Sequence, residues 1–515
     1  MSRTKWYAKP IYVMVALALV LSLGIMAVPA VAATTINVPL DYPTIQAAID
    51  AASDGATIIV AAGIYEETVS IKDKSLTLLG AQADEPIVNG ERAGDESIIR
   101  GKLDWRDRPS TYCLVRIQHS DVVINGFSIE NAKQWNIGIQ GHPEAISNIL
   151  ISYNYIVGDS VYHKDGIFRD NAAADVTIDH NYIASNSRGI ATNGGATTVT
   201  DNTFYHNGQG IAFMGIDPYD VYFPDYAEPN YPTIISGNTF TDDSTSIYLR
   251  LDKGHQSITV TGNDITEARN DAIRTWNVYD EDIVNPAINF NNMWNNEFGI
   301  NNPVEEINLN ATNNWWGAKD GPSGVGPGSG DAVSANVDYD PWLGAEPAEV
   351  KSETISGSGT MTDTAIGGQV TINGDGDHTI TTAAYAENPG GACPFTNEGS
   401  YYDVHLDSAD GVNSLTVQFC PALEGENISY WDGISWVAAS NQIYSDGCIV
   451  VTITDDTQPS LADLTGTPFG QGFMPPVGGE AYMVSQVSLM LPWIALAVPI
   501  IAGVAIFIRR RRGQS

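Results

Sequence analysis

The sequence predicts an all-β protein whose larger part is a β-solenoid, and two features of the chain support this fold class. An eight-residue phrase recurs five times and carries asparagine at its sixth position each time. A small residue followed by isoleucine comes after every copy. The asparagines are Asn154, Asn181, Asn202, Asn238 and Asn263, and the pairs are Gly166-Ile167, Gly189-Ile190, Gly210-Ile211, Ser246-Ile247 and Ala272-Ile273.

The spacing of the repeats fits one solenoid coil each. Successive asparagines are 27, 21, 36 and 25 residues apart, which is room for two or three short strands and one irregular excursion. A single unit cannot bury its apolar face, but stacked units pair strand on strand and bury a continuous row of side chains. We interpret the asparagines as structural, because asparagine tolerates left-handed turns and stacked amides can form a hydrogen-bonded ladder.

The solenoid is predicted to span residues 33–343. The segment PTIQAAIDAAS places apolar residues at helical spacing from Ile45 to Ala52, which is typical of a helix that covers the first coil. Towards the other end the repeat gives way to Gly, Pro and aromatic residues, and Trp342 lies near the end of the domain. The chain therefore has room for a long stack of coils behind a helical cap.

Three segments of the chain resemble a known family. They are the YPTIQAAIDAASDGATIIVAAGIYEETVSI opening, the asparagine-centred coils, and NNWWG at Asn313 to Gly317 with VDYDPWL after it. Together they are similar to right-handed parallel β-helix proteins of the pectin lyase-like superfamily, including the surface and periplasmic group related to NosD. The resemblance implies a right-handed parallel β-helix. GIYEE at Gly63 to Glu67 also resembles the first motif of pectin methylesterases, but the later Gln, Asp and Arg motifs are not found, which disfavours that activity.

Both ends of the chain predict export and anchoring. Residues 1–32 have basic residues, an apolar run and an Ala-Val-Ala site, which is typical of a secretory signal peptide. Residues 487–508 carry no charge and are followed by four arginines in the tail 509–515, which predicts a transmembrane helix with a cytoplasmic tail. Residues 473–486 would be a Gly/Pro stalk. We therefore expect the large amino-terminal part to lie outside the cytoplasmic membrane.

The net charge excludes one class of partner. The whole chain carries −36, and removal of three basic residues near the start and four arginines at the end leaves −43. Such a surface repels nucleic acid, so an acidic polysaccharide would need local arginines or bridging divalent cations. A surface that only keeps an exported rod soluble is the simpler alternative.

Residues 344–472 are predicted to form a small β-sandwich, because alternating strand segments are broken by Gly, Asn and Asp turns. The stretch from Tyr430 to Trp436 resembles accessory modules of prokaryotic surface proteins. Trp431 and Trp436 could form a platform for sugars, but packing in the core is favoured. Among the four cysteines we predict a Cys420–Cys448 disulfide, with Cys113 and Cys393 unassigned.

Candidate functional side chains occupy the outer face of neighbouring coils, because the interior of a β-helix is filled with apolar residues. Counting from each small-Ile pair gives three columns that run along one surface, with about 5 Å between rungs. The position two before isoleucine holds Asp165, Arg188, Gln209, Thr245 and Asp271; one after holds Phe168, Ala191, Ala212, Tyr248 and Arg274; three after holds Asp170, Asn193, Met214, Arg250 and Trp276.

These columns suggest roles if the protein cleaves uronic-acid polymers. A lyase needs a base near the sugar C5 proton and a cation, often calcium, on the carboxylate. The candidate bases are Arg188, Arg250, Arg274 and His163, and the candidate calcium ligands are Asp165, Asp170 and Asp271. Ordinary solvated residues of a solenoid would give the same pattern.

Aromatic residues predict where sugar rings would lie. The longest interval between repeats contains GIDPYDVYFPDYAEPNYP, residues 215–232, in which prolines stiffen the segment. Insertions tend to gather on the binding face of a solenoid. The predicted substrate-binding residues are Tyr219, Tyr222, Tyr226, Tyr248 and Trp276.

Three functions follow from these observations. The leading hypothesis is a membrane-anchored, extracytoplasmic β-helix that binds or processes a polysaccharide or surface glycan along the outer groove. The second is a non-catalytic surface rod for adhesion or envelope structure. The third, a NosD-like periplasmic metal-handling protein, lacks clustered His, Cys or Met ligands. Whether the protein is an enzyme stays open; if it is one, a polysaccharide lyase is expected.

Overall fold

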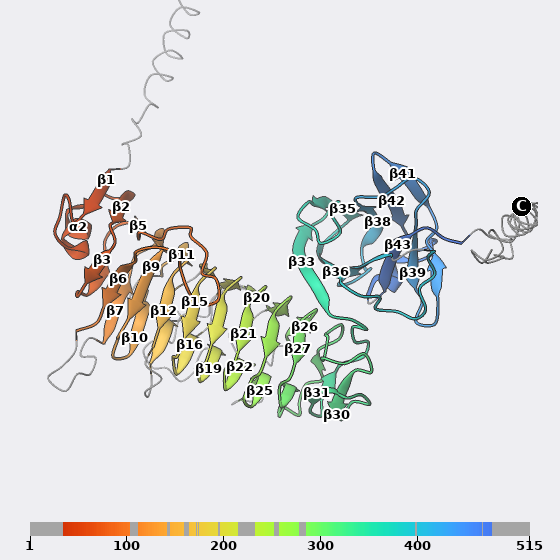
Figure 1. Cartoon of the computed structure of the whole chain (residues 1–515), viewed down its shortest axis with the longest axis horizontal. Coiled ribbons are helices and arrows are strands. Elements are labelled where there is room, and N and C mark those ends of the chain that lie inside the picture. Colours follow the sequence, from red (N-terminus) through yellow and green to blue (C-terminus); the bar gives the residue numbers. More distant parts are fainter. Residues whose placement is uncertain are drawn as a thin grey trace, which may run out of the picture.

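The computed structural model forms two joined bodies, a β-helix and a smaller β-sandwich (Figure 1). The predicted signal peptide and the apolar segment 487–508 lie outside the described part of the chain. Within that part, no helix has the length and apolar character that a membrane span requires. The structure describes residues 34–102, 112–141, 145–158, 164–170, 173, 175–193, 196–214, 232–251, 257–277, 285–396, 399–465 and 467–475.

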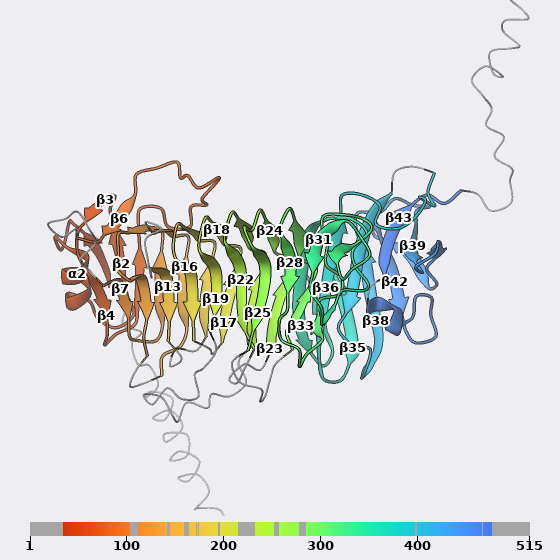
Figure 2. The same ribbon diagram turned by 90° about the horizontal axis from the view of Figure 1, so that it is seen from below.

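Three parallel sheets, which we call A, B and C, run along the first body (Figures 1 and 2). Sheet A is β1 Thr35–Val38, β2 Ala56–Val60, β5 Leu76–Leu79, β8 Val122–Asn125, β11 Ile149–Ser152, β14 Val176–Asp179, β17 Thr197–Thr200, β20 Pro232–Ser236, β23 Ser257–Thr261, β26 Ala287–Asn289, β29 Leu309–Asn310 and β32 Val337–Asp338. Sheet B is β3 Gly63–Tyr65, β6 Ser97–Arg100, β9 Phe127–Glu130, β12 Tyr155–Val157, β15 Tyr182–Ala184, β18 Thr203–Tyr205, β21 Thr239–Thr241, β24 Asp264–Thr266 and β27 Asn292–Trp294. Sheet C is β4 Val69–Ile71, β7 Cys113–Ile117, β10 Trp135–Ile139, β13 Asp165–Arg169, β16 Arg188–Thr192, β19 Gln209–Phe213, β22 Thr245–Arg250, β25 Asp271–Trp276, β28 Phe298–Asn301, β30 Pro322–Gly324 and β31 Gly330–Val333.

Each complete coil contributes one strand to each sheet. β14, β15 and β16 follow one another in the chain and pair with β17, β18 and β19 of the next coil, in parallel and in register. The spatial order of strands therefore follows the order of coils in the sequence, which is the topology of a parallel β-helix and confirms the predicted fold.

The interior is filled by stacked aliphatic and aromatic side chains. In sheet B, Phe204 and Phe240 stack with ring centroids 4.6 Å apart. Each fully buried side chain of this size stabilises the fold by about 1.5–3 kcal/mol. The sheet A column is Ile58, Leu78, Ile124, Ile151, Ile178, Val199, Ile235, Val260 and Ile288, all fully or almost fully buried.

An asparagine ladder joins sheets A and B. The backbone N–H and Nδ2 of Asn154 both donate to Oδ1 of Asn181, at 2.9 and 3.1 Å. The same pair of bonds links each later asparagine to the next and continues to Asn314. This confirms the predicted structural role of the repeated asparagines. It also adds Asn291 and Asn314, which the eight-residue phrase did not reveal.

A second ladder, between sheets B and C, was not predicted. The backbone N–H of Asn186 donates to Oδ1 of Asn207 at 3.0 Å, and that of Asn207 donates to Oδ1 of Asp243 at 2.7 Å. After a break the ladder resumes, and the Asn296 N–H donates to Oδ1 of Asp331 at 3.1 Å. Two members of this ladder are therefore carboxyl groups in amide positions.

The helix α2, Ile45–Ala51, covers the first coil as predicted. The Thr44 side chain accepts a hydrogen bond from Ala47 N–H. The Glu67 carboxylate accepts from the N–H groups of Ile45 and Gln46, both at 2.9 Å. These contacts satisfy donors that the start of a helix leaves free.

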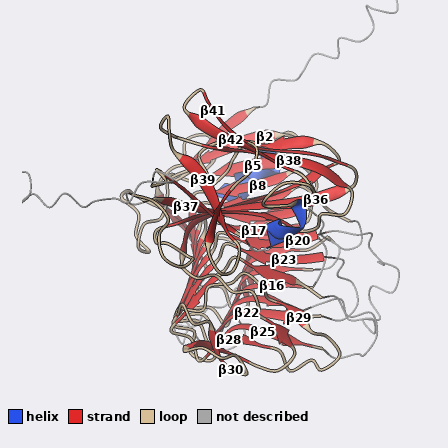
Figure 3. Ribbon diagram, turned by 90° about the vertical axis from the view of Figure 1, so that its right-hand side faces the viewer, coloured by secondary structure: helices blue, strands red, loops and turns tan. Residues whose placement is uncertain are grey.

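The second body is an antiparallel sandwich of two sheets, D and E (Figure 3). Cys420 and Cys448 form a disulfide, as predicted. A short 3-10 helix, η1 Leu461–Thr465, precedes the last strand. Sheet D is β33 Pro347–Ser356, β36 Asp377–Tyr385, β37 Ser400–Leu406, β43 Pro468–Gly472, β39 Asn427–Trp431 and β40 Trp436–Ala438. Sheet E is β34 Gly359–Met361, β35 Val370–Gly374, β38 Val412–Phe419, β42 Cys448–Ile453 and β41 Gln442–Ser445.

A separate apolar cluster joins the two bodies. Phe290 and Leu343 of the β-helix pack with Tyr385, Phe395 and Tyr401 of the sandwich. Because these side chains are buried, the sandwich is docked on the β-helix rather than held by the chain connection alone.

Candidate functional site

Figure 2 shows the strands of sheet C stacked along the first body, and their register is the one that the sequence predicted for the outer face. Asp165 pairs with Arg188, which pairs with Gln209, and the column continues through Thr245 to Asp271. The neighbouring column runs from Phe168 through Ala191, Ala212 and Tyr248 to Arg274. The candidate residues of these two columns therefore lie on one surface.

Asp165 and Arg188 form a bidentate ion pair. Nε and Nη2 of Arg188 donate to the two carboxylate oxygens of Asp165, at 2.7 and 2.8 Å. The Asp165 side chain is almost fully buried, whereas about a third of the Arg188 side chain is exposed. This geometry holds the guanidinium in a fixed orientation on the surface.

Asp271 is held in a similar way at the other end of the column. Nη1 of Arg274 donates to one carboxylate oxygen at 3.1 Å, and Nδ2 of Asn301 donates to the other at 2.9 Å. Both predicted acids in this column therefore have arginine partners on the same face.

The three predicted calcium ligands do not converge on one point. Asp165 and Asp271 are separated by four strand steps, or about 19 Å at the usual strand spacing. Asp170 follows β13, and its Oδ1 accepts from the backbone N–H of Gly141 at 3.2 Å. One ion could not bind both Asp165 and Asp271, so the calcium prediction requires separate sites.

An aromatic cluster with one arginine lies where β22 and β25 end. The rings of Tyr248 and Trp276 are 6.1 Å apart and tilted by 40°. The Arg250 guanidinium lies 5.8 Å from the centroid of Trp276. Arg250 also donates through Nη1 to the Met214 carbonyl at 3.0 Å. Trp276 is 40% exposed and offers an accessible aromatic surface.

A second aromatic pair lies nearer the start of the same face. Trp135 and Phe168 stack with centroids 4.4 Å apart and planes within 9°. Counting positions from the repeats gives Phe168 but misses Trp135, because the register places Asn136-Ile137, rather than a small-Ile pair, at that point of its coil. The remaining predicted residues, His163, Tyr219, Tyr222 and Tyr226, lie outside the described residues.

A different face carries a group with metal-ligand chemistry. Asp179, His180 and Asp201 each place one ligand atom within 4.8 Å of the others. His180 Nδ1 lies 2.8 Å from Asp179 Oδ2, and the His180 ring stacks on Tyr153. Burial raises the pKa of Asp201. These residues lie at the turn between sheets A and B, and no pattern in the sequence pointed to them beyond their position beside the ladder asparagines.

The comparisons with known proteins concern the fold. No family model matches the chain, and no curated protein matches it. Solved structures do match. By its own strand topology, the first body of this chain is a parallel β-helix.

Three of these structures illustrate the likeness. The rice weevil pectin methyl esterase is 17% identical, with 46% of this chain and 77% of that chain covered and a TM-score of 0.31. The alginate lyase from Paenibacillus sp. is 13% identical, with 50% and 94% covered and a TM-score of 0.32. A tailspike protein of the Acinetobacter baumannii bacteriophage Fri1, a capsular polysaccharide depolymerase, is 9% identical, with 86% and 85% covered and a TM-score of 0.32. At this level of likeness, neither reaction nor substrate transfers to this chain.

Proposed function

We propose that this β-helix binds a polysaccharide along the outer face of sheet C, outside the cytoplasmic membrane, with residues 487–508 as its anchor. The observation that carries the proposal is the cluster of Tyr248, Arg250 and Trp276. It combines exposed aromatic surface with a guanidinium that is fixed by a backbone carbonyl. Aromatic faces pack against the C–H faces of sugar rings, and guanidinium N–H groups donate to sugar oxygens.

The regular spacing of side chains along the outer face of sheet C suits an extended polymer. Neighbouring strands of sheet C repeat every ~4.8 Å. Two aromatic positions, Trp135–Phe168 and Tyr248–Trp276, are separated by coils whose outward residues include Arg188 and Gln209. A polymer that runs parallel to the β-helix axis would meet a polar or aromatic side chain at most steps.

Binding is better supported than bond cleavage. Arginine retains its proton in proteins and is therefore a poor base. Arg188 and Arg274 are each held by a carboxylate, which suits positioning of a ligand more than proton abstraction. A lyase reaction would use His163 or a separately bound cation, and the assay below distinguishes that alternative.

The test uses Trp276→Ala with a matched control. Trp294 is 42% exposed, as Trp276 is 40% exposed, but it lies on sheet B. We expect Trp276→Ala to weaken retention on a bound polysaccharide at least about tenfold, since stacked aromatic contacts dominate such sites. Trp294→Ala should bind as the parent does. The assay is affinity electrophoresis against neutral and uronic-acid polysaccharides, with and without calcium.

Each result has a defined meaning. A calcium-dependent rise in unsaturated-uronate absorbance would add lyase activity. Equal retention of Trp276→Ala and the parent would contradict the proposed face. Absence of binding to every polymer would favour the alternative, a non-catalytic surface rod.

A further inference from the structure

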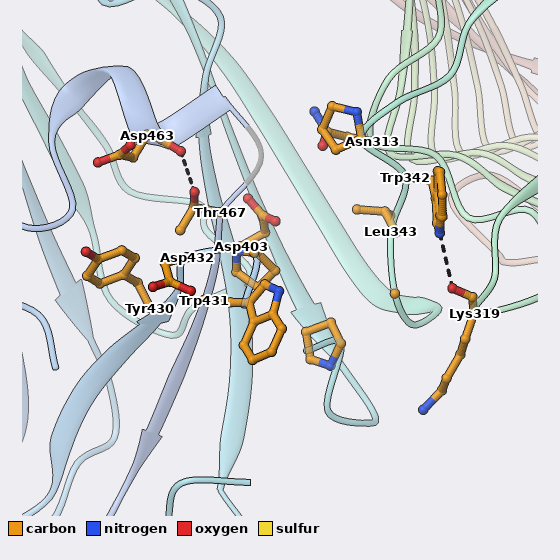
Figure 4. A pocket seen from close by; sticks show the side chains of 15 residues that line it. Asn313, Lys319, Trp342, Leu343, Asp403, Tyr430, Trp431, Asp432, Asp463 and Thr467 are labelled. Atoms are coloured by element: carbon orange, nitrogen blue, oxygen red, sulfur yellow. Dashed lines mark hydrogen bonds between the residues drawn. The ribbon is translucent and has the colours of Figure 1, made fainter. Parts of the chain in front are cut away.

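A cavity of about 470 Å³ lies where the sandwich meets the end of the β-helix (Figure 4). Lys319 and Trp342 line it from the β-helix side, and Asp403, Tyr430 and Trp431 line it from the sandwich. Small-molecule sites have volumes of about 300–1,000 Å³ and often form between domains. The size and position of this cavity therefore suit a ligand of one or two rings.

Asp403 provides a buried polar group that lacks one partner. It lies on β37 and is 1% exposed. One carboxylate oxygen accepts from the Tyr385 hydroxyl at 3.1 Å, but the other, Oδ1, has no hydrogen-bond partner within the described part of the chain. Leaving a buried oxygen unsatisfied costs about 1–3 kcal/mol. Oδ1 is enclosed in the unliganded protein, so a ligand hydroxyl would reach it after a small rotation of the Asp403 side chain, and a hydrogen bond donated to Oδ1 would then remove this cost.

Two indole rings approach the cavity from different bodies, as Figure 4 shows. One side of Trp431 packs on glycine backbone, because a Cβ on Gly391 would come within 2.5 Å of its ring. Trp342 is oriented by a hydrogen bond from its Nε1 to the Lys319 carbonyl, at 3.1 Å. Both rings are therefore fixed before any ligand arrives, which lowers the entropic cost of binding.

The charges around the cavity exclude anionic ligands. Asp403, Asp432 and Asp463 line it, and its lysine, Lys319, lies 3.5 Å from Glu387. A uronate or phosphate group would meet carboxylates with little compensating positive charge.

The hydrogen bonds of the acids favour a hydroxyl ligand over a cation. Asp432 accepts from the N–H groups of Ile434 and Ser435, at 2.8 and 2.7 Å. Asp463 accepts from the N–H and hydroxyl of Ser460, both at 2.8 Å. Burial raises the pKa of Asp403 to about 7, so about half of this carboxyl is protonated near neutral pH and its mean charge is lower than that of an exposed aspartate.

We propose that this cavity binds a neutral sugar residue, with Trp342 and Trp431 against its C–H faces and Asp403 hydrogen-bonded to one of its hydroxyls. The site shares no residue with the sheet C face. Its existence does not depend on the function proposed for that face, and each can be disproved without the other.

The experiment measures sugar binding to the full-length protein in a buffer free of glycosides and sugar-based detergents. Tryptophan fluorescence and calorimetry would follow titration with glucose, galactose, mannose and N-acetylglucosamine, with tetramethylammonium as a cation probe. We expect saturable binding of at least one sugar. Affinity should fall at least tenfold in Trp431→Ala and in Asp403→Leu, which removes the acceptor, whereas Trp276→Ala should bind as the parent does.

Trp436→Phe is the matched control. Its ring centroid lies 5.6 Å from that of Trp431, yet Trp436 does not line the cavity. Trp342→Phe provides a milder second variant if Trp431→Ala unfolds, and melting curves would confirm that each variant is folded. Three results would overturn the proposal: no sugar binds, binding survives both cavity substitutions, or tetramethylammonium binds while the sugars do not.

Discussion

The two ladders of the β-helix occupy successive turns of each coil but differ in chemistry. Between sheets A and B every member from Asn154 to Asn314 is an amide, which both donates and accepts. Between sheets B and C, Asp243 and Asp331 replace amides. A carboxylate can only accept hydrogen bonds, whereas an amide also donates them. A buried aspartate can therefore take the place of an amide only when its carboxyl group is protonated. The first ladder is therefore insensitive to pH, whereas the second should depend on it.

The pKa shifts of the two acids follow from their surroundings. Burial raises the pKa of Asp243 to about 7, although bonds from Asn207 oppose the shift. Its Oδ2 has no hydrogen-bond partner among the residues that the structure describes. In the preceding ladder member, Asn207, the atom that corresponds to Asp243 Oδ2 is Nδ2, which donates to the Ile183 carbonyl at 3.0 Å. Burial raises the pKa of Asp331 to about 6, and both of its oxygens accept from Asn296.

The largest expected effect is in the all-amide ladder. Asn202→Ala would remove Nδ2 bonds to the carbonyls of Ile178 and Thr200, and would leave the Asn181 N–H without its acceptor. We expect the free energy of unfolding to fall by about 3 kcal/mol or more, because buried groups become unsatisfied. Denaturant unfolding measures this. Asn148→Ala, which removes an exposed side-chain bond to Asp121, is the control, and an equal loss in both variants would contradict the ladder's role.

The second largest effect should be a gain in the free energy of unfolding rather than a loss. Asp243→Asn should raise the free energy of unfolding at pH 8 and leave it nearly unchanged at pH 4. Below about pH 4 the carboxyl is protonated in both states. As the pH rises towards 7, the unfolded chain releases the proton while the folded protein retains it, so the parent loses stability. The gain should be on the order of 1.4 kcal/mol per unit of pKa shift.

Unfolding curves of parent and variant across pH 4–8 test this prediction. A constant difference between the two proteins over that range would show that Asp243 does not titrate with folding. Asp179→Asn, at a partly exposed position two coils earlier, controls for the loss of one negative charge.

The smallest effect is expected at Asp331. Asp331→Asn should also stabilise the protein more at pH 8 than at pH 4, because its folded pKa is raised to about 6. The gain should be smaller than at Asp243, since the shift is smaller and Asn296 already donates to both oxygens. The same pH series measures it, and a larger gain than that of Asp243→Asn would reverse the order proposed for the two acids.

The features of the fold that could be predicted from the sequence are those that depend on side chains repeated once per coil. The β-helix, the first ladder and the register of sheet C all follow from patterns that repeat once per coil, and the Cys420–Cys448 pairing was also predicted. The second ladder was missed because its members change identity from Asn186 to Asp243, which hides the repeat. The ion pair of Asp165 with Arg188 was missed because adjacent positions in a column do not show which side chains will meet.

The junction cavity could not be predicted for another reason. Its two indoles, Trp342 and Trp431, are far apart in the sequence and line one cavity only because the sandwich docks on the β-helix through Phe290 and Tyr401. Nothing periodic encodes that docking. The Trp431 ring, for which the sequence favours core packing, packs on glycine backbone and also lines the cavity.

The strand boundaries also bear on how such a chain can change in evolution. Two residues separate sheet A from sheet B in successive coils, as between Asp179 and Tyr182 or Thr200 and Thr203, and the first ladder depends on that count. After sheet C the connection varies widely: β17 begins soon after Thr192, whereas β20 begins long after Phe213. From β14 to β28, insertions and deletions can therefore accumulate at the corner after sheet C while the other two corners keep their length to within one residue, so new recognition segments can be acquired without disturbing the stack.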